Sequence, residues 1–287
     1  MKKTIAILLA LALALMSLCS MAIAEAGIPD TSGIAAESDM ADVEDIVPEG
    51  MQPVTPDMLN DGTYAVQVDS SSSMFKITGC DLTVKDGAMT AVLYMKSDAY
   101  QFMFPDTAQA ASEAAYEDLV ALEALDDGRY AFTLPVDALD AGYTCAAFSA
   151  RKQLWYPRTL LFHADSLPLE AWKTLTTAET LGLADGTYRC DAAITGGGKA
   201  TVASPAQLVV ENGTCTAVLQ FSTEKIDYVI VDGTKYEPTA TEGGATFTVP
   251  VGAFDVGLSI VVDSTAITPA VEVGYTLRLD SASIQAE

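Results

Sequence analysis

Histidine is nearly absent from this chain, and positive charge is scarce. The 287 residues include one histidine, 15 lysines and arginines, and 39 aspartates and glutamates, for a formal net charge of −24. So acidic a surface repels nucleic acid and anionic lipid, and neither is expected as a partner. The histidine, His163, follows a strand-like run and is expected at the surface. A zinc site is not expected, because the sequence has no CxxC spacing.

Recognisable catalytic motifs are missing as well. The sequence contains no glycine-rich nucleotide loop and no nucleophile elbow, and a Ser-His-Asp triad would have to use His163 without a supporting motif. Acidic residues are abundant, so a hydrolase with two catalytic carboxylates stays an alternative, although no spacing singles out one pair. We therefore expect a binding protein rather than an enzyme.

Long apolar runs are absent beyond the N-terminus. Two lysines precede an apolar run over 5–16, and Ala22-Ile23-Ala24 offers the small residues that signal peptidase requires. The run is too short to span a bilayer. We predict a signal peptide over 1–24 and a secreted or surface-associated protein with no integral membrane segment. Cys19 raises the alternative of a lipoprotein, which the bulky Leu18 before it disfavours.

The segment over 25–57 differs in composition from the rest of the chain. It contains four prolines and many acids, and no lysine or arginine occurs between Lys3 and Lys76. A segment of this kind buries too little apolar surface to fold alone. We predict an acidic, disordered linker.

Two copies of one pattern fill the chain from about residue 58 onward. The matched segments are 61–64 with 185–188, 82–87 with 208–213, 90–93 with 216–219, and 132–136 with 247–251. Their shared order indicates an internal duplication. We predict a first repeat over 58–168, a linker over 169–182 and a second repeat over 183–287.

The matched segments alternate apolar and polar residues, as strands do. The pairs Asp86-Gly87 and Asn212-Gly213 have the composition of two-residue hairpin turns. Pro135 and Pro250 fall at outward-facing positions, where a missing N–H is tolerated at a sheet edge. The predicted fold is all-β, with two tandem immunoglobulin-like β-sandwich domains. A helix over 107–125 is predicted as an insertion in the first, with Asp106 and Gln109 in capping-box spacing.

Each repeat contains two cysteines at strand positions that face inward. In an oxidising compartment the pairs Cys80–Cys145 and Cys190–Cys215 are predicted to form disulfides. The alternative is four buried free thiols, because cysteine is among the residues most often buried.

The order of these elements, from DGTY through an Asn-Gly hairpin and an FxVPV strand to a closing YTL strand, resembles the near-iron-transporter (NEAT) family of secreted haem-binding domains. The resemblance covers most of both repeats. It implies an immunoglobulin-like sandwich that holds haem between a lip near the start of the domain and a hairpin near its end. It also implies that tyrosine or methionine ligates the iron, so a chain poor in histidine is suitable.

Carried over residue by residue, the resemblance places a haem site in the first repeat. Tyr156 is the predicted iron ligand and Met103 a second one. The lip hydroxyls would receive a propionate, and the apolar side chains would contact the porphyrin. The predicted haem-binding residues are Ser72, Ser73, Met74, Phe75, Met103, Trp155 and Tyr156. The alternative for the aromatic residues is ordinary core packing.

The second repeat departs from the family pattern. Its lip reads Gly196-Gly197-Gly198-Lys199, and 266–273 contains no Tyr, Met or His, while Tyr275 shares the parity of core residues. The second repeat is therefore expected to lack an iron site. The predicted function is capture or relay of haem or an iron complex outside the cell, with other surface or transport proteins as candidate partners. The alternative is a surface interaction or adhesion module without a small-molecule ligand.

Overall fold

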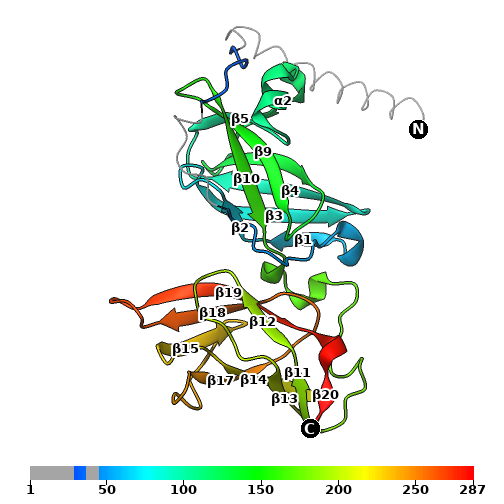
Figure 1. Ribbon diagram of the computed structural model, residues 1–287. Helices are drawn as coiled ribbons and strands as arrows, with labels where there is room; N and C mark the ends of the chain where they lie inside the picture. Colours follow the sequence, from blue (N-terminus) through cyan, green and yellow to red (C-terminus); the bar gives the residue numbers. More distant parts are fainter. Residues whose placement is uncertain (1–28, 37–44) are drawn as a thin grey trace, which may run out of the picture.

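The computed structural model describes residues 29–36 and 45–287. Within these ranges the chain forms four antiparallel, five-stranded sheets, which build two β-sandwiches joined end to end (Figure 1). One large core fills each sandwich, and a smaller one lies under the helix of the first. The all-β, two-domain prediction is confirmed. No helix in the described ranges is long and apolar enough to cross a membrane.

The first domain has the sheet orders β1-β3-β4-β8-β7 and β2-β10-β9-β5-β6. Its strands are β1 (Gly62–Ala65), β2 (Val68–Ser70), β3 (Ile77–Lys85), β4 (Ala88–Met95), β5 (Tyr100–Phe104), β6 (Val120–Ala121), β7 (Glu123–Ala124), β8 (Tyr130–Val136), β9 (Gly142–Ser149) and β10 (Trp155–Phe162). Its helical elements are η2 (Pro56–Met58), α2 (Ala108–Glu113), η3 (Tyr116–Asp118), η4 (Ala164–Ser166) and η5 (Leu169–Ala171).

The second domain has the sheet orders β17-β14-β13-β11-β20 and β12-β19-β18-β15-β16. Its strands are β11 (Gly186–Cys190), β12 (Ala192–Thr195), β13 (Ala206–Glu211), β14 (Thr214–Gln220), β15 (Ile226–Val231), β16 (Thr234–Tyr236), β17 (Thr246–Pro250), β18 (Leu258–Ser264), β19 (Val271–Leu279) and β20 (Gln285–Ala286). One 3-10 turn, η6 (Ser281–Ser283), precedes the last strand.

The two domains share one topology. The strand orders β1-β3-β4-β8 and β2-β10-β9-β5 of the first domain reappear as β11-β13-β14-β17 and β12-β19-β18-β15 in the second. Register also agrees, because Phe162 pairs with the first residue of β2, and Leu279 pairs with the first residue of β12. Position 156 in β10 therefore corresponds to 273 in β19, and 158 corresponds to 275.

The predicted turns and proline positions are confirmed. Asp86 and Asn212 have φ near +50°, each followed by a glycine with positive φ, which is the geometry of a two-residue hairpin. Pro250 lies on the edge strand β17, and Pro135 faces outward on β8 beyond the short pairing with β7. Each proline therefore has no neighbouring strand on one side, so its missing N–H breaks no hydrogen bond there.

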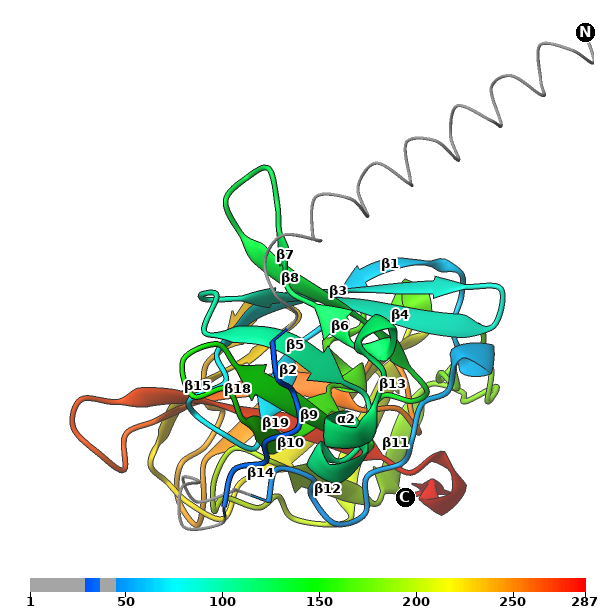
Figure 2. The same cartoon turned by 90° about the horizontal axis from the view of Figure 1, so that it is seen from above.

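The predicted helix is shorter than expected. α2 ends at Glu113, and its N-cap is Thr107, whose hydroxyl accepts from the Ala110 N–H at 3.2 Å. The rest of the predicted helix forms η3, β6 and β7, and the two strands pair with the edges of the two sheets. Backbone pairing at these edges outweighs the helical propensity of the sequence. α2 contacts β9 and β10, in front of which it lies in Figure 2.

The predicted acidic linker is not a free spacer where the structure describes it. Around residue 34 the chain lies beside the start of β10, where Trp155 N–H donates to the Gly33 carbonyl and Ala35 N–H donates to the Trp155 carbonyl. Val54, farther along, is buried and pairs with Leu139. These contacts correct the prediction of disorder for 29–36 and 45–57. The predicted signal peptide and Cys19 lie outside the described residues.

The predicted linker over 169–182 is packed against both domains in its first part, although 179–182 is exposed. Trp172 is buried in the core of the first domain and pairs with Leu59, and Thr176 pairs with Phe254 of the second domain. Second-domain residues Ala253 and Val256 belong to the same core as Trp172. The junction between the domains is therefore an apolar contact rather than a flexible connection.

The predicted disulfides are not present. All four cysteines described are free and buried. Cys190 on β11 and Cys215 on β14 have β13 between them, and they pair with positions four residues apart on it, Ala206 and Val210. Two strand spacings alone imply a separation of at least about 9–10 Å, beyond the ~7 Å limit for a bridge. Cys80 and Cys145 lie on opposing sheets within the main core. Burial raises the pKa of both to about 12, so they stay protonated thiols.

Candidate functional site

A groove of about 700 Å³ opens on the first domain. It lies between residues 71–75, called the lip below, the start of β5 and the β9–β10 hairpin. Its lining includes Ser72 and Met74 of the lip, Tyr100 of β5, Arg151 and Lys152 of the hairpin, and Tyr156 and Arg158 of β10. Three residues of the predicted haem site, Ser72, Met74 and Tyr156, thus come together here.

The lip is a hydrogen-bonded turn. Phe75 N–H donates to the Ser72 carbonyl at 3.0 Å, and the Ser71 hydroxyl accepts from Thr159 N–H of β10 at 2.9 Å. Phe75 is buried and meets the ring of Tyr100 edge-on, at 5.1 Å between centroids. These contacts hold the backbone of the lip against the domain. The Met74 side chain is 67% exposed, which is unusual for methionine and leaves its thioether at the groove.

Arg158 is a buried cation in the floor of the groove. Along β10 it points to the same side as Tyr156 and Leu160, and it is only 6% exposed. Its Nη1 donates to the Pro157 carbonyl at 2.7 Å, and its Nη2 donates to the Tyr100 hydroxyl at 3.1 Å. Its Nε is buried without any hydrogen-bond partner. The guanidinium carbon lies 5.3 Å from the centre of the Tyr156 ring.

The charge of the groove is opposite to that of the protein. Arg151, Lys152 and Arg158 line it, against the single carboxylate of Asp98. Among the described residues, none of these cations lies within 4.0 Å of a carboxylate. In a chain of net charge −24, this concentration of unpaired cations favours an anionic ligand.

Four predicted haem-binding residues do not line the groove. Met103 is fully buried in the main core, which corrects its prediction as a second iron ligand, and Phe75 lies beneath the lip. Ser73 is exposed on a separate hollow behind the lip. Trp155 is fully buried in the small core beneath α2, and its indole N–H donates to the Thr31 carbonyl at 2.7 Å. Trp155 points away from the groove because it precedes Tyr156 in β10, and successive side chains of a strand face opposite sides.

The second domain lacks the corresponding groups. Val273 stands where the first domain has Tyr156, and Tyr275 stands where it has Arg158. Tyr275 is buried in the core, as predicted, and its hydroxyl accepts from Ala200 N–H at 3.4 Å. The hollow here is smaller, about 360 Å³. Gly197 packs so closely on the Gly274 carbonyl that a Cβ would lie 2.0 Å from its oxygen.

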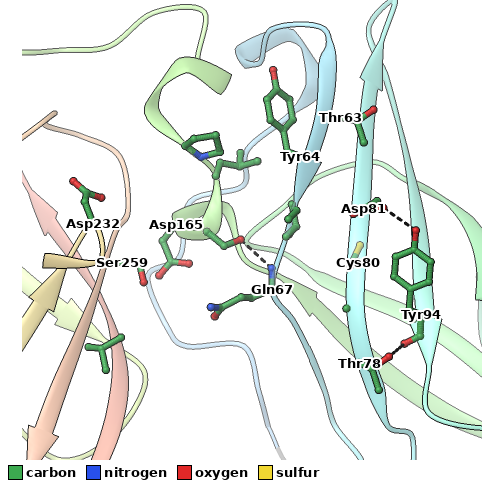
Figure 3. Close-up of a pocket in the computed structure, with 18 of the residues that line it drawn as sticks. Thr63, Tyr64, Gln67, Thr78, Cys80, Asp81, Tyr94, Asp165, Asp232 and Ser259 are labelled. Atoms are coloured by element: carbon green, nitrogen blue, oxygen red, sulfur yellow. Dashed lines mark hydrogen bonds between the residues drawn. The ribbon is translucent and has the colours of Figure 1, made fainter. Parts of the chain in front are cut away.

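A second groove, of about 980 Å³, lies between the domains (Figure 3). Several of its polar side chains already have partners. The Tyr94 hydroxyl donates to Asp81 at 2.7 Å, and the Arg129 guanidinium lies over the Tyr94 ring. Asp165 accepts a hydrogen bond from Thr276 across the junction at 2.6 Å. Because Asp81, Arg129 and Asp165 already have partners and its other charged residues, Glu170 and Asp232, are acidic in a strongly acidic chain, this groove is the weaker candidate for a ligand site.

His163 lies near this junction and is only partly exposed, which corrects its prediction as a surface histidine. Its Nε2 is 2.9 Å from Asp69, and its Nδ1 is 3.9 Å from Asp165. Burial disfavours the imidazolium, but the hydrogen bond and charge of Asp69, with Asp165 and Asp140, outweigh burial and raise the pKa of His163. The hydrogen bond from His163 lowers the pKa of Asp69.

These shifts predict a pH window for the pair. The histidine contribution to stability is complete below its unfolded pKa and is lost as pH rises through the raised folded pKa. Asp69 contributes above its unfolded pKa and loses this as pH falls through its lowered folded pKa. Asp69→Asn should therefore cost more stability at pH 5.5 than at pH 8.5, by up to about 1 kcal/mol because Asp69 is well exposed.

Urea unfolding at the two pH values measures this difference. The single histidine also gives one resolvable imidazole signal, so its pKa can be titrated directly by NMR in the native protein and in the variant. A His163 pKa that stays unchanged in Asp69→Asn would contradict the pairing.

The tyrosine and the lip were found from the sequence, whereas the basic residues of the groove were not. In the sequence Arg158 stands out only as part of a strand motif. The residues around it do not indicate that its side chain is buried or that it lacks a carboxylate partner. A scan against protein-family models finds no match to this chain, and a search of the curated proteins finds no matching sequence. The groove must therefore be interpreted from its own chemistry.

Proposed function

We propose that the first domain captures haem, or a similar planar iron complex with acidic groups, in the groove beneath the lip, and that the protein is exported as its sequence predicts. The observation that carries the proposal is the meeting of the Tyr156 phenol, the exposed Met74 side chain and the unpaired Arg158 guanidinium in one groove. A haem presents an iron, an apolar ring and two carboxylates. Tyr156 would bind the iron, Met74 would contact the ring and Arg158 would pair with a carboxylate.

The size and the ligand chemistry of the groove support the proposal. A volume of about 700 Å³ falls within the usual range of small-molecule sites. Tyrosine is an established axial ligand of ferric haem, and Tyr156 lines the groove from a regular strand whose pairing with β9 fixes its backbone. In the second domain the equivalent strand, β19, has Val273 at the position of Tyr156 and so provides no iron ligand there. We therefore assign capture to the first domain.

Titration of hemin into the purified full-length protein tests the proposal. We expect a shifted Soret band that saturates at one hemin per chain. Tyr156→Phe removes the phenol oxygen and keeps the ring, so affinity should fall about tenfold or more, since a net contribution on the order of 1.4 kcal/mol is a factor of ten. The Soret position should move as well, because the iron ligand changes.

Tyr116→Phe is the matched control. Tyr116 is partly buried in the first domain but packs on Phe102 outside the groove. It should bind hemin as the native protein does. If the native protein does not bind hemin, the proposal fails and the interaction or adhesion hypothesis takes its place.

A further inference from the structure

We infer that Arg158 is a receptor for a ligand carboxylate, so that the groove selects planar apolar molecules bearing an acidic group, whether or not they carry a metal. This inference rests on the proposed function but concerns a different contact. It predicts that a carboxylate of the ligand enters the groove and pairs with Arg158, in addition to any bond between Tyr156 and iron.

The first argument is electrostatic. A buried cation without a carboxylate partner is costly, because desolvation is not offset by an opposite charge. Arg158 is 6% exposed, and among the described residues no carboxylate lies within 4.0 Å of it. A ligand anion would supply the missing charge.

The second argument is the geometry of the guanidinium. Arginine has five N–H donors, and two are used by the Pro157 carbonyl and the Tyr100 hydroxyl, which leaves three. One of these three is the Nε–H, which is buried and unpartnered. The two existing bonds hold the plane of the guanidinium in place. A carboxylate can then accept from adjacent N–H groups of the same plane.

The third argument comes from the duplication. The equivalent position in the second domain is Tyr275, which is equally buried but uncharged, and whose hydroxyl has a backbone partner. The fold therefore does not need a cation at this position. Arg158 is a feature of the domain that has the groove and the tyrosine ligand, and in the described part of the chain it is the only buried arginine.

The two tyrosines and the lip define what accompanies the carboxylate. Tyr100 and Tyr156 place their rings 5.8 and 5.3 Å from the guanidinium carbon, and the exposed Met74 side chain also lines the groove. These surfaces suit a flat apolar body. Arg151 and Lys152 at the rim would attract a second acidic group of the same molecule.

The test compares two iron-free porphyrins on the full-length protein. Protoporphyrin IX carries two carboxylates, and its dimethyl ester carries none. We expect the native protein to bind the free acid about ten- to a hundredfold more tightly than the ester, the range of a hydrogen-bonded charge pair. Arg158→Gln should weaken binding of the acid by a similar factor and leave binding of the ester unchanged.

Stability of the ligand-free protein is the second measurement. Arg158→Tyr introduces the residue of the second domain, and its urea midpoint should equal or exceed that of the native protein. A clear loss of stability, or equal weakening of acid and ester by Arg158→Gln, would assign Arg158 a structural role and overturn the inference.

The outcomes separate this inference from the proposed function. If hemin binds and depends on Tyr156 while the acid and the ester bind equally, the carboxylate receptor is wrong and haem capture stands. If the free acid binds as tightly as hemin and Tyr156→Phe changes neither, iron ligation is wrong and the receptor stands. If neither hemin nor the free acid binds, both are wrong.

Discussion

Trp155→Ala is expected to lower the free energy of unfolding by about 3–5 kcal/mol, the usual cost of removing a fully buried large aromatic side chain. Trp155, the first residue of β10, is completely buried in the small core beneath the helix α2, where it packs against Phe148 at 5.1 Å between ring centroids. The substitution would also leave the Thr31 carbonyl without the indole donor. Urea unfolding, followed by circular dichroism, measures the loss.

Trp155→Phe provides the graded control. It keeps an aromatic ring in the small core and removes the N–H, so a cost of about 1–2 kcal/mol is expected from the lost hydrogen bond and volume. Under conditions where the variants remain folded, both should bind hemin as the native protein does. A Trp155→Phe variant of native stability with weakened hemin binding would show that the indole faces the ligand after all.

A fragment limited to 58–168 is expected to be largely unfolded. It lacks Val54 and Trp172, which are buried in the core of the first domain, and the segment around Ile34 that pairs with β10. Loss of the Trp172 side chain alone should cost about 3–5 kcal/mol, against a total stability of about 5–15 kcal/mol for a typical domain. Circular dichroism and a urea titration of the fragment test this.

The matched longer fragment spans 29–182 and restores all three contacts. It should unfold cooperatively at a clearly higher urea concentration than the shorter fragment. Equal midpoints for the two fragments would mean that the flanking segments contribute nothing to the stability of the domain.

Much of the architecture could be predicted from local patterns. The Asn212-Gly213 turn and the alternation around it determine a hairpin within about ten residues, because a strand pair joined by two residues has one preferred register. The repeated segments then predicted two domains with the same strand order, which the structure confirms. Where the pattern failed, as over 107–125, partners distant in sequence supplied the backbone hydrogen bonds.

The candidate site was predictable only in part. Tyr156 and Met74 were identified through resemblance to the NEAT family, and the structure brings them to one groove. Strand parity places Trp155 and Tyr156 on opposite faces, but the sequence could not indicate which face opens to solvent. That depends on the lip and the segment around Ile34, which approach β10 from far along the chain.

By itself, the sequence determined the strands, their turns, the duplication and the scarcity of catalytic groups, because these follow from residue type and short-range spacing. The tertiary structure decided which side chains are accessible. It left four cysteines as separate buried thiols, because strand order sets the distance between them. It buried Arg158 without a carboxylate beside Tyr156, because burial and pairing depend on which strands meet at the open end of the sandwich.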